Sequence, residues 1–135
     1  MMRIQPIQPP SWSQPRGYSN GVLVEDPSRF VFTAGQIAWD ADQHLVGRGD
    51  FVAQFRQALS NVLTVVGEAG GQAEHLVRLT VYVSDKDAYL AATRELGAVY
   101  RELMGGHYPA MALVQVAALL EEGALVEIEG TAALP

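Results

Sequence analysis

The sequence predicts a two-layer α+β domain in which two helices cover one face of a mixed sheet. Apolar residues recur at helical spacing in two segments, 51–66 and 88–104. They alternate with polar residues in a third segment, 77–83, as in a strand. Glycines and prolines separate such segments, and the predicted order is β-β-α-β-α-β-β. A length of 135 residues fits one domain.

The N-terminal region predicts an extended arm over residues 1–17, followed by a single domain over 18–135. Four prolines exclude a regular helix from the arm. Two short apolar runs, 22–25 and 30–34, predict the first strands of the domain. The sequence Asp-Pro-Ser-Arg between them has turn chemistry, so we expect the two strands to pair as a hairpin.

Capping residues define the two helices. Asp50 is suited to cap the helix over 51–66, and glycines follow that helix directly. Asp87 is suited to cap the helix over 88–104. We therefore expect two uninterrupted amphipathic helices.

The stretch from His107 to Gly130 reads as two apolar strands joined by an acidic turn. In the first of these strands, both alternating sets of residues are largely apolar, and two helices on one face cannot cover both sets. A large open apolar face predicts that another subunit covers it. In the second strand, alternation places Glu127 and Glu129 on the same face.

The composition narrows the range of functions. A formal net charge of −6 and a pI of about 4.9 disfavour a nucleic acid partner. The chain has no cysteine, which excludes disulfides and thiolate nucleophiles. The N-terminus has no signal-peptide core and no apolar run is long enough to span a bilayer, so we expect a cytoplasmic protein without a membrane partner. His44, His75 and His107 lack a His or Glu at metal-ligand spacing, and we expect no metal or cofactor.

Five segments together resemble one family. They are RGYSNGV (16–22), VFTAGQIAWD (31–40), QFRQALSNVLTVVGEAGG (54–71), VRLTVYVSD (77–85) and YPAMALVQVAALLEEGALVEIEG (108–130). In this order they resemble the RidA family, also called YjgF or L-PSP endoribonucleases. The resemblance implies a chorismate mutase-like fold and a homotrimer with small-molecule clefts between subunits. It also implies hydrolysis of reactive enamines and imines to ketoacids and ammonia.

The resemblance also implies site residues. Glu127 matches the cleft glutamate and would orient or activate a water. The residues expected to line the ligand site are Tyr18, Ala34, Gly35, Met111 and Ala112. Without the resemblance, Glu127 reads as a solvated strand acid, while Met111 and Tyr18 read as packing residues.

One position departs from the family pattern. Where the deaminases carry an arginine that binds the substrate carboxylate, this chain has Met111. A guanidinium–carboxylate bond contributes about 1.5–3 kcal/mol, so a 2-imino acid is expected to bind at least about tenfold more weakly. Arg16 and Arg78 are candidates for a replacement cation.

Three functions remain open at this point. The first is a hydrolytic deaminase with an altered substrate, such as a neutral or cationic imine. The second is a non-catalytic trimer that binds a metabolite, which the loss of the arginine favours. The third is an endoribonuclease, which the acidic charge and the lack of a basic groove disfavour.

Overall fold

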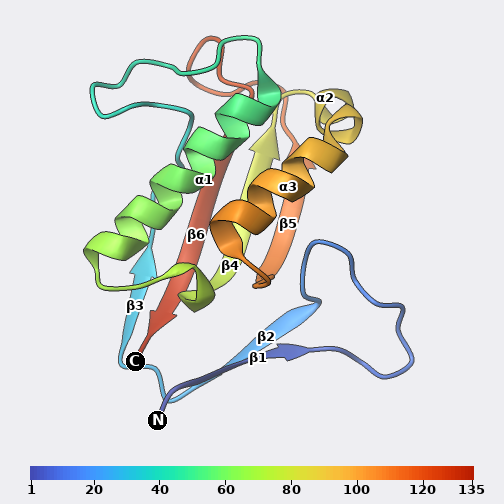
Figure 1. Ribbon diagram of the computed structural model, residues 1–135, viewed down its shortest axis with the longest axis vertical. Coiled ribbons are helices and arrows are strands. Elements are labelled where there is room, and N and C mark those ends of the chain that lie inside the picture. The colour runs from blue at the N-terminus through green and yellow to red at the C-terminus, as the bar shows by residue number, and fades with distance from the viewer.

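The computed structural model describes residues 1–135 (Figure 1). The strands are β1 (Arg3–Ile7), β2 (Gly21–Glu25), β3 (Arg29–Phe32), β4 (Leu76–Val83), β5 (Ala110–Gln115) and β6 (Val126–Leu134). The helices are α1 (Phe51–Glu68), α2 (Lys86–Ala91) and α3 (Thr93–Met104), with a 3-10 turn η1 at Ala73–His75. No helix combines the length and the apolar character that crossing a membrane requires.

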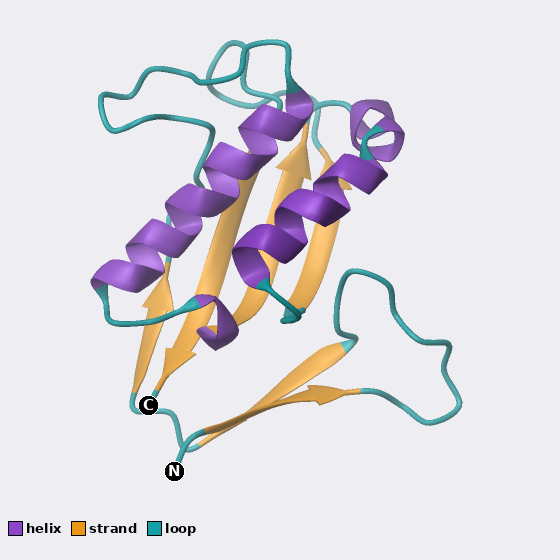
Figure 2. Cartoon of the chain, viewed as in Figure 1, coloured by secondary structure: helices purple, strands orange, loops and turns teal.

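The main sheet has the strand order β3-β6-β4-β5. Strands β4 and β5 are parallel, and the other neighbours are antiparallel. Helices α1 and α3 lie side by side over one face of this sheet, as Figure 2 shows. The predicted two-layer α+β architecture is confirmed.

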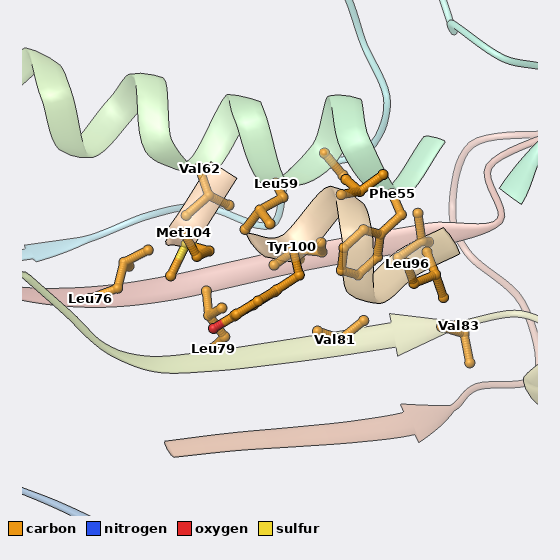
Figure 3. Close-up of a cluster of buried hydrophobic side chains, with 14 of the residues drawn as sticks. Phe55, Leu59, Val62, Leu76, Leu79, Val81, Val83, Leu96, Tyr100 and Met104 are labelled. Atoms are coloured by element: carbon orange, nitrogen blue, oxygen red, sulfur yellow. The ribbon is translucent and has the colours of Figure 1, made fainter. Parts of the chain in front are cut away.

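The core fills the space between these two helices and the sheet (Figure 3). Leu59 and Val62 of α1 meet Leu79 and Val81 of β4 there, and each of the four side chains is at most 1% exposed. Burying a side chain of this kind contributes roughly 1.5–3 kcal/mol. From Leu79 onward, every second residue of β4 enters this core, so the residues between them face the other side of the sheet.

Helix α1 begins where the sequence predicts. The Asp50 carboxylate accepts a hydrogen bond from the Ala53 N–H at 3.1 Å and caps the first turn. The helix continues to Glu68, two residues beyond the predicted end, and Gly70 follows with a φ of +89°. Glycine adopts this left-handed conformation without strain, which explains the stop.

Side-chain amides on α1 position the start of β6. The fully buried Gln54 donates to the Gly123 carbonyl at 3.0 Å and accepts from the Leu125 N–H at 2.8 Å. Two turns further along the same side of α1, Asn61 donates to the Trp39 carbonyl at 2.8 Å. These bonds tie one helix both to the segment after β3 and to the turn before β6.

The second helix differs from the prediction. It is divided into α2 and α3 by Ala92, whose φ of −113° and ψ of 13° interrupt the helix. Asp85 caps α2 by accepting from the Asp87 N–H at 2.9 Å, so the predicted cap at Asp87 is wrong. The break turns the chain between Tyr89 and Thr93, which is a change of direction that apolar spacing does not report.

The predicted hairpin between the first two strands of the domain is also wrong. Strand β2 pairs with β1, which lies in the N-terminal arm, while β3 pairs with β6. Asp26 has a φ of 54° in the turn between β2 and β3, and the two strands enter separate sheets there. In Figure 1 the β1–β2 ribbon accordingly lies apart from the main sheet.

The face of the sheet opposite the helices is less apolar than the sequence predicts. Phe30 and Phe32 of β3 are 53% and 74% exposed on it. The prediction rested on β5 alone. By contrast, the residues that β4 and β6 place on this face are mostly polar or charged. They are Arg78, Thr80, Tyr82, Glu127, Glu129, Thr131 and Ala133. We call this surface the open face.

Candidate functional site

Glu127 stands on the open face, in the middle of the sheet. Its neighbours Val126 and Ile128 are fully buried in the core, so alternation directs Glu127 to the opposite side. Its side chain is half-buried and takes part in no hydrogen bond or ion pair of the chain. The carboxylate is therefore available to water or to a ligand.

A bulge after β3 brings Gly35 against this carboxylate. Phe32 pairs with Thr131, and Gln36 pairs with Ile128, so four steps on one strand face three on the other. The extra residue is accommodated next to Gly35. A Cβ built on Gly35 would lie 2.2 Å from Oε2 of Glu127, so only glycine fits while the acid keeps this position.

Backbone and side-chain hydrogen bonds fix the bulge. Thr33 donates its N–H to the Gly130 carbonyl, and its hydroxyl accepts from the Gly130 N–H, both at 2.9 Å. Gln36 and Ile128 exchange backbone hydrogen bonds of 2.8 and 2.9 Å. Ala34 lies exposed within the bulge, beside Gly35. The structure thus brings three predicted site residues, Ala34, Gly35 and Glu127, together.

The two neighbouring acids of β6 differ in their partners. Glu129 accepts a hydrogen bond from the Tyr82 hydroxyl at 2.7 Å, whereas Glu127 has no such donor. That hydrogen bond, followed by burial and by the charges of Glu129 and Glu127, raises the pKa of Tyr82 above its usual value. Tyr82 therefore stays protonated as a donor to Glu129, and Glu127 is the free acid of the pair.

Tyr18 and Met111 lie elsewhere, at the edge of β5. They line a hollow of about 250 Å³ together with Arg16 and Tyr89. Met111 points toward the helix side of the sheet, because it pairs with the buried Leu79 and packs against the core. The structure thus joins a second pair of predicted site residues, Tyr18 and Met111.

Within one chain the two groups do not meet. Strand β4 separates the strand of Met111 from the strand of Glu127, and the two side chains point to opposite faces of the sheet. Ala112 alternates with Met111 and lies on the open face opposite Thr80. A cleft that contains both Glu127 and Met111 therefore requires surfaces of two copies of the chain.

The two candidates for a replacement cation, Arg16 and Arg78, line different hollows. Arg16 lines the hollow of Tyr18 and Met111. Arg78 lines a different hollow of about 210 Å³ on the open face, beside Glu129 and Thr131. Of the two, Arg16 is the one next to the methionine.

One group of side chains has the composition of a metal site. Asp40, Asp42 and His44 place their ligand atoms within 4.8 Å of one another, in the loop after the bulge. Asp40 already accepts from the N–H groups of Asp42 and His44, each at 2.9 Å. The bond from the His44 N–H is the largest cause of a lowered pKa of Asp40; burial opposes it, and the Asp42 N–H and the charge of His44 add to the lowering. Asp42 and His44 of this group are exposed in the turn.

Comparison with known proteins identifies the family. The family model described as endoribonuclease L-PSP matches residues 12–134. The chain belongs to the endoribonuclease L-PSP family. The resemblance to RidA and YjgF drawn from the sequence is thereby confirmed.

Members of the L-PSP family match over most or all of the chain. A RutC family protein of Synechocystis is 35% identical over 136 residues, which cover 100% of this chain and 98% of that protein. The 2-iminobutanoate/2-iminopropanoate deaminase of Homo sapiens is 30% identical over 115 residues, 85% of this chain and 78% of the human one.

Solved structures of the family confirm the fold. A protein of unknown function of the conserved Rid family, from Yersinia pestis, superposes with a TM-score of 0.87 and 32% identity, over 97% of this chain and 98% of that one. The YjgF gene product of E. coli gives a TM-score of 0.69 and 30% identity, over 86% and 87% of the two chains. The predicted chorismate mutase-like fold of the L-PSP family is confirmed.

Sequence reasoning missed two features of the surface around Glu127. Tyr82 faces the acids of β6, and its alternation with Val81 and Val83 would have placed it on the open face. The bulge at Thr33 has no comparable signal, since only the pairing with β6 reveals the extra residue.

Proposed function

We propose that this chain is a hydrolytic deaminase that acts on an imine or enamine at clefts shared by neighbouring copies in a homotrimer. The observation that supports this most strongly is the position of Glu127, a half-buried carboxylate without a partner and in contact with Gly35. Such a carboxylate is suited to orient a water and to move its proton.

The reaction requires little from the protein. Water adds to the carbon of the C=N bond, and each of its two protons passes by way of Glu127 to the nitrogen. The first proton is transferred as the C–O bond forms. The second is transferred as the C=O bond forms and the C–N bond breaks to release ammonia. The oxidation state of the carbon does not change, so no redox partner is needed. One carboxylate and one ordered water are sufficient for the two proton transfers.

The shared cleft follows from the separation of the two groups. Glu127 and Met111 point to opposite faces of the sheet, so they can line one cleft only when two copies pack together. A human relative is named for action on 2-iminobutanoate and 2-iminopropanoate. Because Met111 presents an apolar surface, we expect a substrate different from those two small acids.

The experiment is a panel of imines generated in situ by an L-amino-acid oxidase. The full chain should accelerate the release of ammonia and of the 2-oxo acid from at least one member, and only slightly from 2-aminoacrylate. No acceleration with any imine, by protein that is folded and oligomeric, would reject a deaminase of 2-imino acids.

The oligomeric state is tested separately. Three chains of 14.6 kDa give about 44 kDa, so light scattering across micromolar concentrations should report a mass near that value. A mass near that of one chain would remove the second copy and with it the shared cleft.

Met111 supports one alternative, a trimer that binds a metabolite without converting it. Binding of a 2-oxo acid without hydrolysis of any imine would establish it. An RNA substrate is disfavoured because the open face carries Glu127 and Glu129 in a chain of net charge −6. RNA cleavage that survives purification and disappears in Glu127→Gln would revive that function.

A further inference from the structure

A second cavity continues from the hollow of Tyr18 and Met111 into the subunit. It measures about 500 Å³ and lies between α3, the β4–β5 part of the sheet and the loop at Arg16. Small-molecule sites commonly measure roughly 300–1,000 Å³. Five of the six residues that line the smaller hollow also line this cavity, so the two form one continuous space.

The wall of this cavity is apolar and partly aromatic. Leu96, Met111 and Leu113 line it, together with a stacked pair formed by Tyr100 and Tyr108. The centroids of the two rings are 5.2 Å apart, and the angle between the ring planes is 12°. The Tyr100 hydroxyl donates to a backbone carbonyl at 2.9 Å, and burial raises the pKa of Tyr100 well above its usual range. The wall therefore presents a neutral, fixed aromatic surface to the cavity.

Arg16 and Arg101 are the charged residues that line the cavity, and no carboxylate does. Neither guanidinium takes part in an ion pair, in a chain with fifteen acids and nine basic residues. Gly97 makes room for one of them, since a Cβ on this residue would lie 3.3 Å from Nη1 of Arg101. Two unpaired guanidiniums at an apolar cavity favour an anion that carries an apolar body.

We propose that this cavity binds a carboxylate with a bulky, preferably aromatic, apolar body, and that Arg16 binds the carboxylate. Arg16 borders both the cavity and the smaller hollow, beside Met111 and Tyr18. The positive charge that position 111 lacks is thus supplied from the N-terminal arm, and Met111 contacts the apolar body instead. That this ligand is the substrate, as its 2-imino acid, rests on the proposed function; the binding itself does not.

The test uses 3-phenylpropanoate as the probe and calorimetric titration of the full chain as the measurement. We expect the neutral 3-phenylpropanamide and the small anion propanoate each to bind at least about tenfold more weakly. Arg16→Gln should weaken binding of 3-phenylpropanoate by the same factor. Arg78→Gln is the matched control, because it removes the same charge from the open face, and it should change the affinity less than about twofold.

Several results would overturn this assignment. They are equal affinity for the acid and the amide, an Arg16→Gln variant that binds like the unaltered chain, an equal loss in Arg78→Gln, and no binding at millimolar probe. The outcome is independent of the deaminase reaction. If no imine is hydrolysed but binding depends on Arg16, the proposed function fails and the cavity stands. If imines are hydrolysed but binding ignores Arg16, only the cavity assignment fails.

Discussion

Two parts of the candidate site are attached to the sheet to very different degrees. We call them the acid side, which contains Glu127 and the bulge at Gly35, and the arm side, which contains Arg16, Tyr18 and Met111. Glu127 stands on a central strand that pairs on both edges, and the bulge against it is fixed through Thr33 and Gln36. Arg16 and Tyr18 stand in a loop that is attached to the sheet mainly at Ser19. There the N–H of Ser19 donates to the Pro109 carbonyl at 3.0 Å, and its hydroxyl donates to the Tyr108 carbonyl.

This difference indicates which part of the candidate site can accept substitutions without disturbing the other. A residue that performs the chemistry needs an accurate position, which a central strand supplies because neighbouring strands restrict it on both sides. A residue that recognises the substrate can lie on a loop, where changes leave the core intact. Replacing an arginine at position 111 by methionine and using Arg16 would alter recognition without moving Glu127.

The largest expected effect concerns the acid. Glu127→Gln keeps the shape of the side chain but removes its ability to take a proton, so imine hydrolysis should fall about 100-fold or more. Stability should change by less than about 0.5 kcal/mol, because Glu127 has no partner to lose. The measurements are kcat by 2-oxo acid release and the urea midpoint.

Glu129→Gln is the matched control for that substitution. It lies two residues away on the same face and already accepts from Tyr82, so kcat should change less than about threefold. Equal losses in the two variants would show that the charge of the open face matters rather than one free acid.

The contact between Gly35 and Glu127 gives a smaller effect. Gly35→Ala would place a Cβ 2.2 Å from Oε2, so the acid must move, and a displaced base costs roughly 10–100-fold in kcat. In a Glu127→Ala background the clash is absent, and Gly35→Ala should then change stability little. If Gly35→Ala costs as much stability without the acid as with it, the close contact is not the reason for glycine.

The recognition side should respond to a gain of charge. Met111→Arg would add a guanidinium beside Tyr18, and hydrolysis of 2-aminoacrylate should rise about tenfold. Met111→Leu is the control, because it keeps an apolar side chain and should produce no gain. If Met111→Arg raises nothing while Glu127 remains essential, the arm side differs from the small-substrate deaminases in more than one residue.

Regular periodicity explains which parts of the fold were predictable. The stripe of α1, its cap at Asp50 and the alternation of β4 are local patterns, and each was predicted within two residues. The pairing of β2 with β1, and of β3 with β6, depends on which edges meet in space. The turn at Asp26 has the chemistry of a hairpin turn but connects two sheets, so local chemistry gave the wrong partner.

The candidate site was predicted only through the resemblance. Periodicity places Glu127 on a face of the sheet but does not say that it lacks a partner while Glu129 has one. The bulge beside Gly35 and the cavity beside Arg16 arise where segments distant in sequence approach each other. Contacts of this kind produce no periodic pattern in the sequence, so they cannot be predicted from residue spacing.

The smallest effect concerns the attachment of the arm. Ser19→Ala removes the hydroxyl bond to the Tyr108 carbonyl, which contributes about 1 kcal/mol to holding the loop in place. If the loop is in place for a smaller fraction of the time, the apparent affinity falls in proportion. KM should therefore rise about fivefold, while kcat, which we propose depends on Glu127, stays within about twofold. Ser28→Ala is the matched control, since the exposed Ser28 hydroxyl bonds to nothing. A fall in kcat with KM unchanged would show that the arm takes part in the chemistry, and the separation of the two sides would not hold.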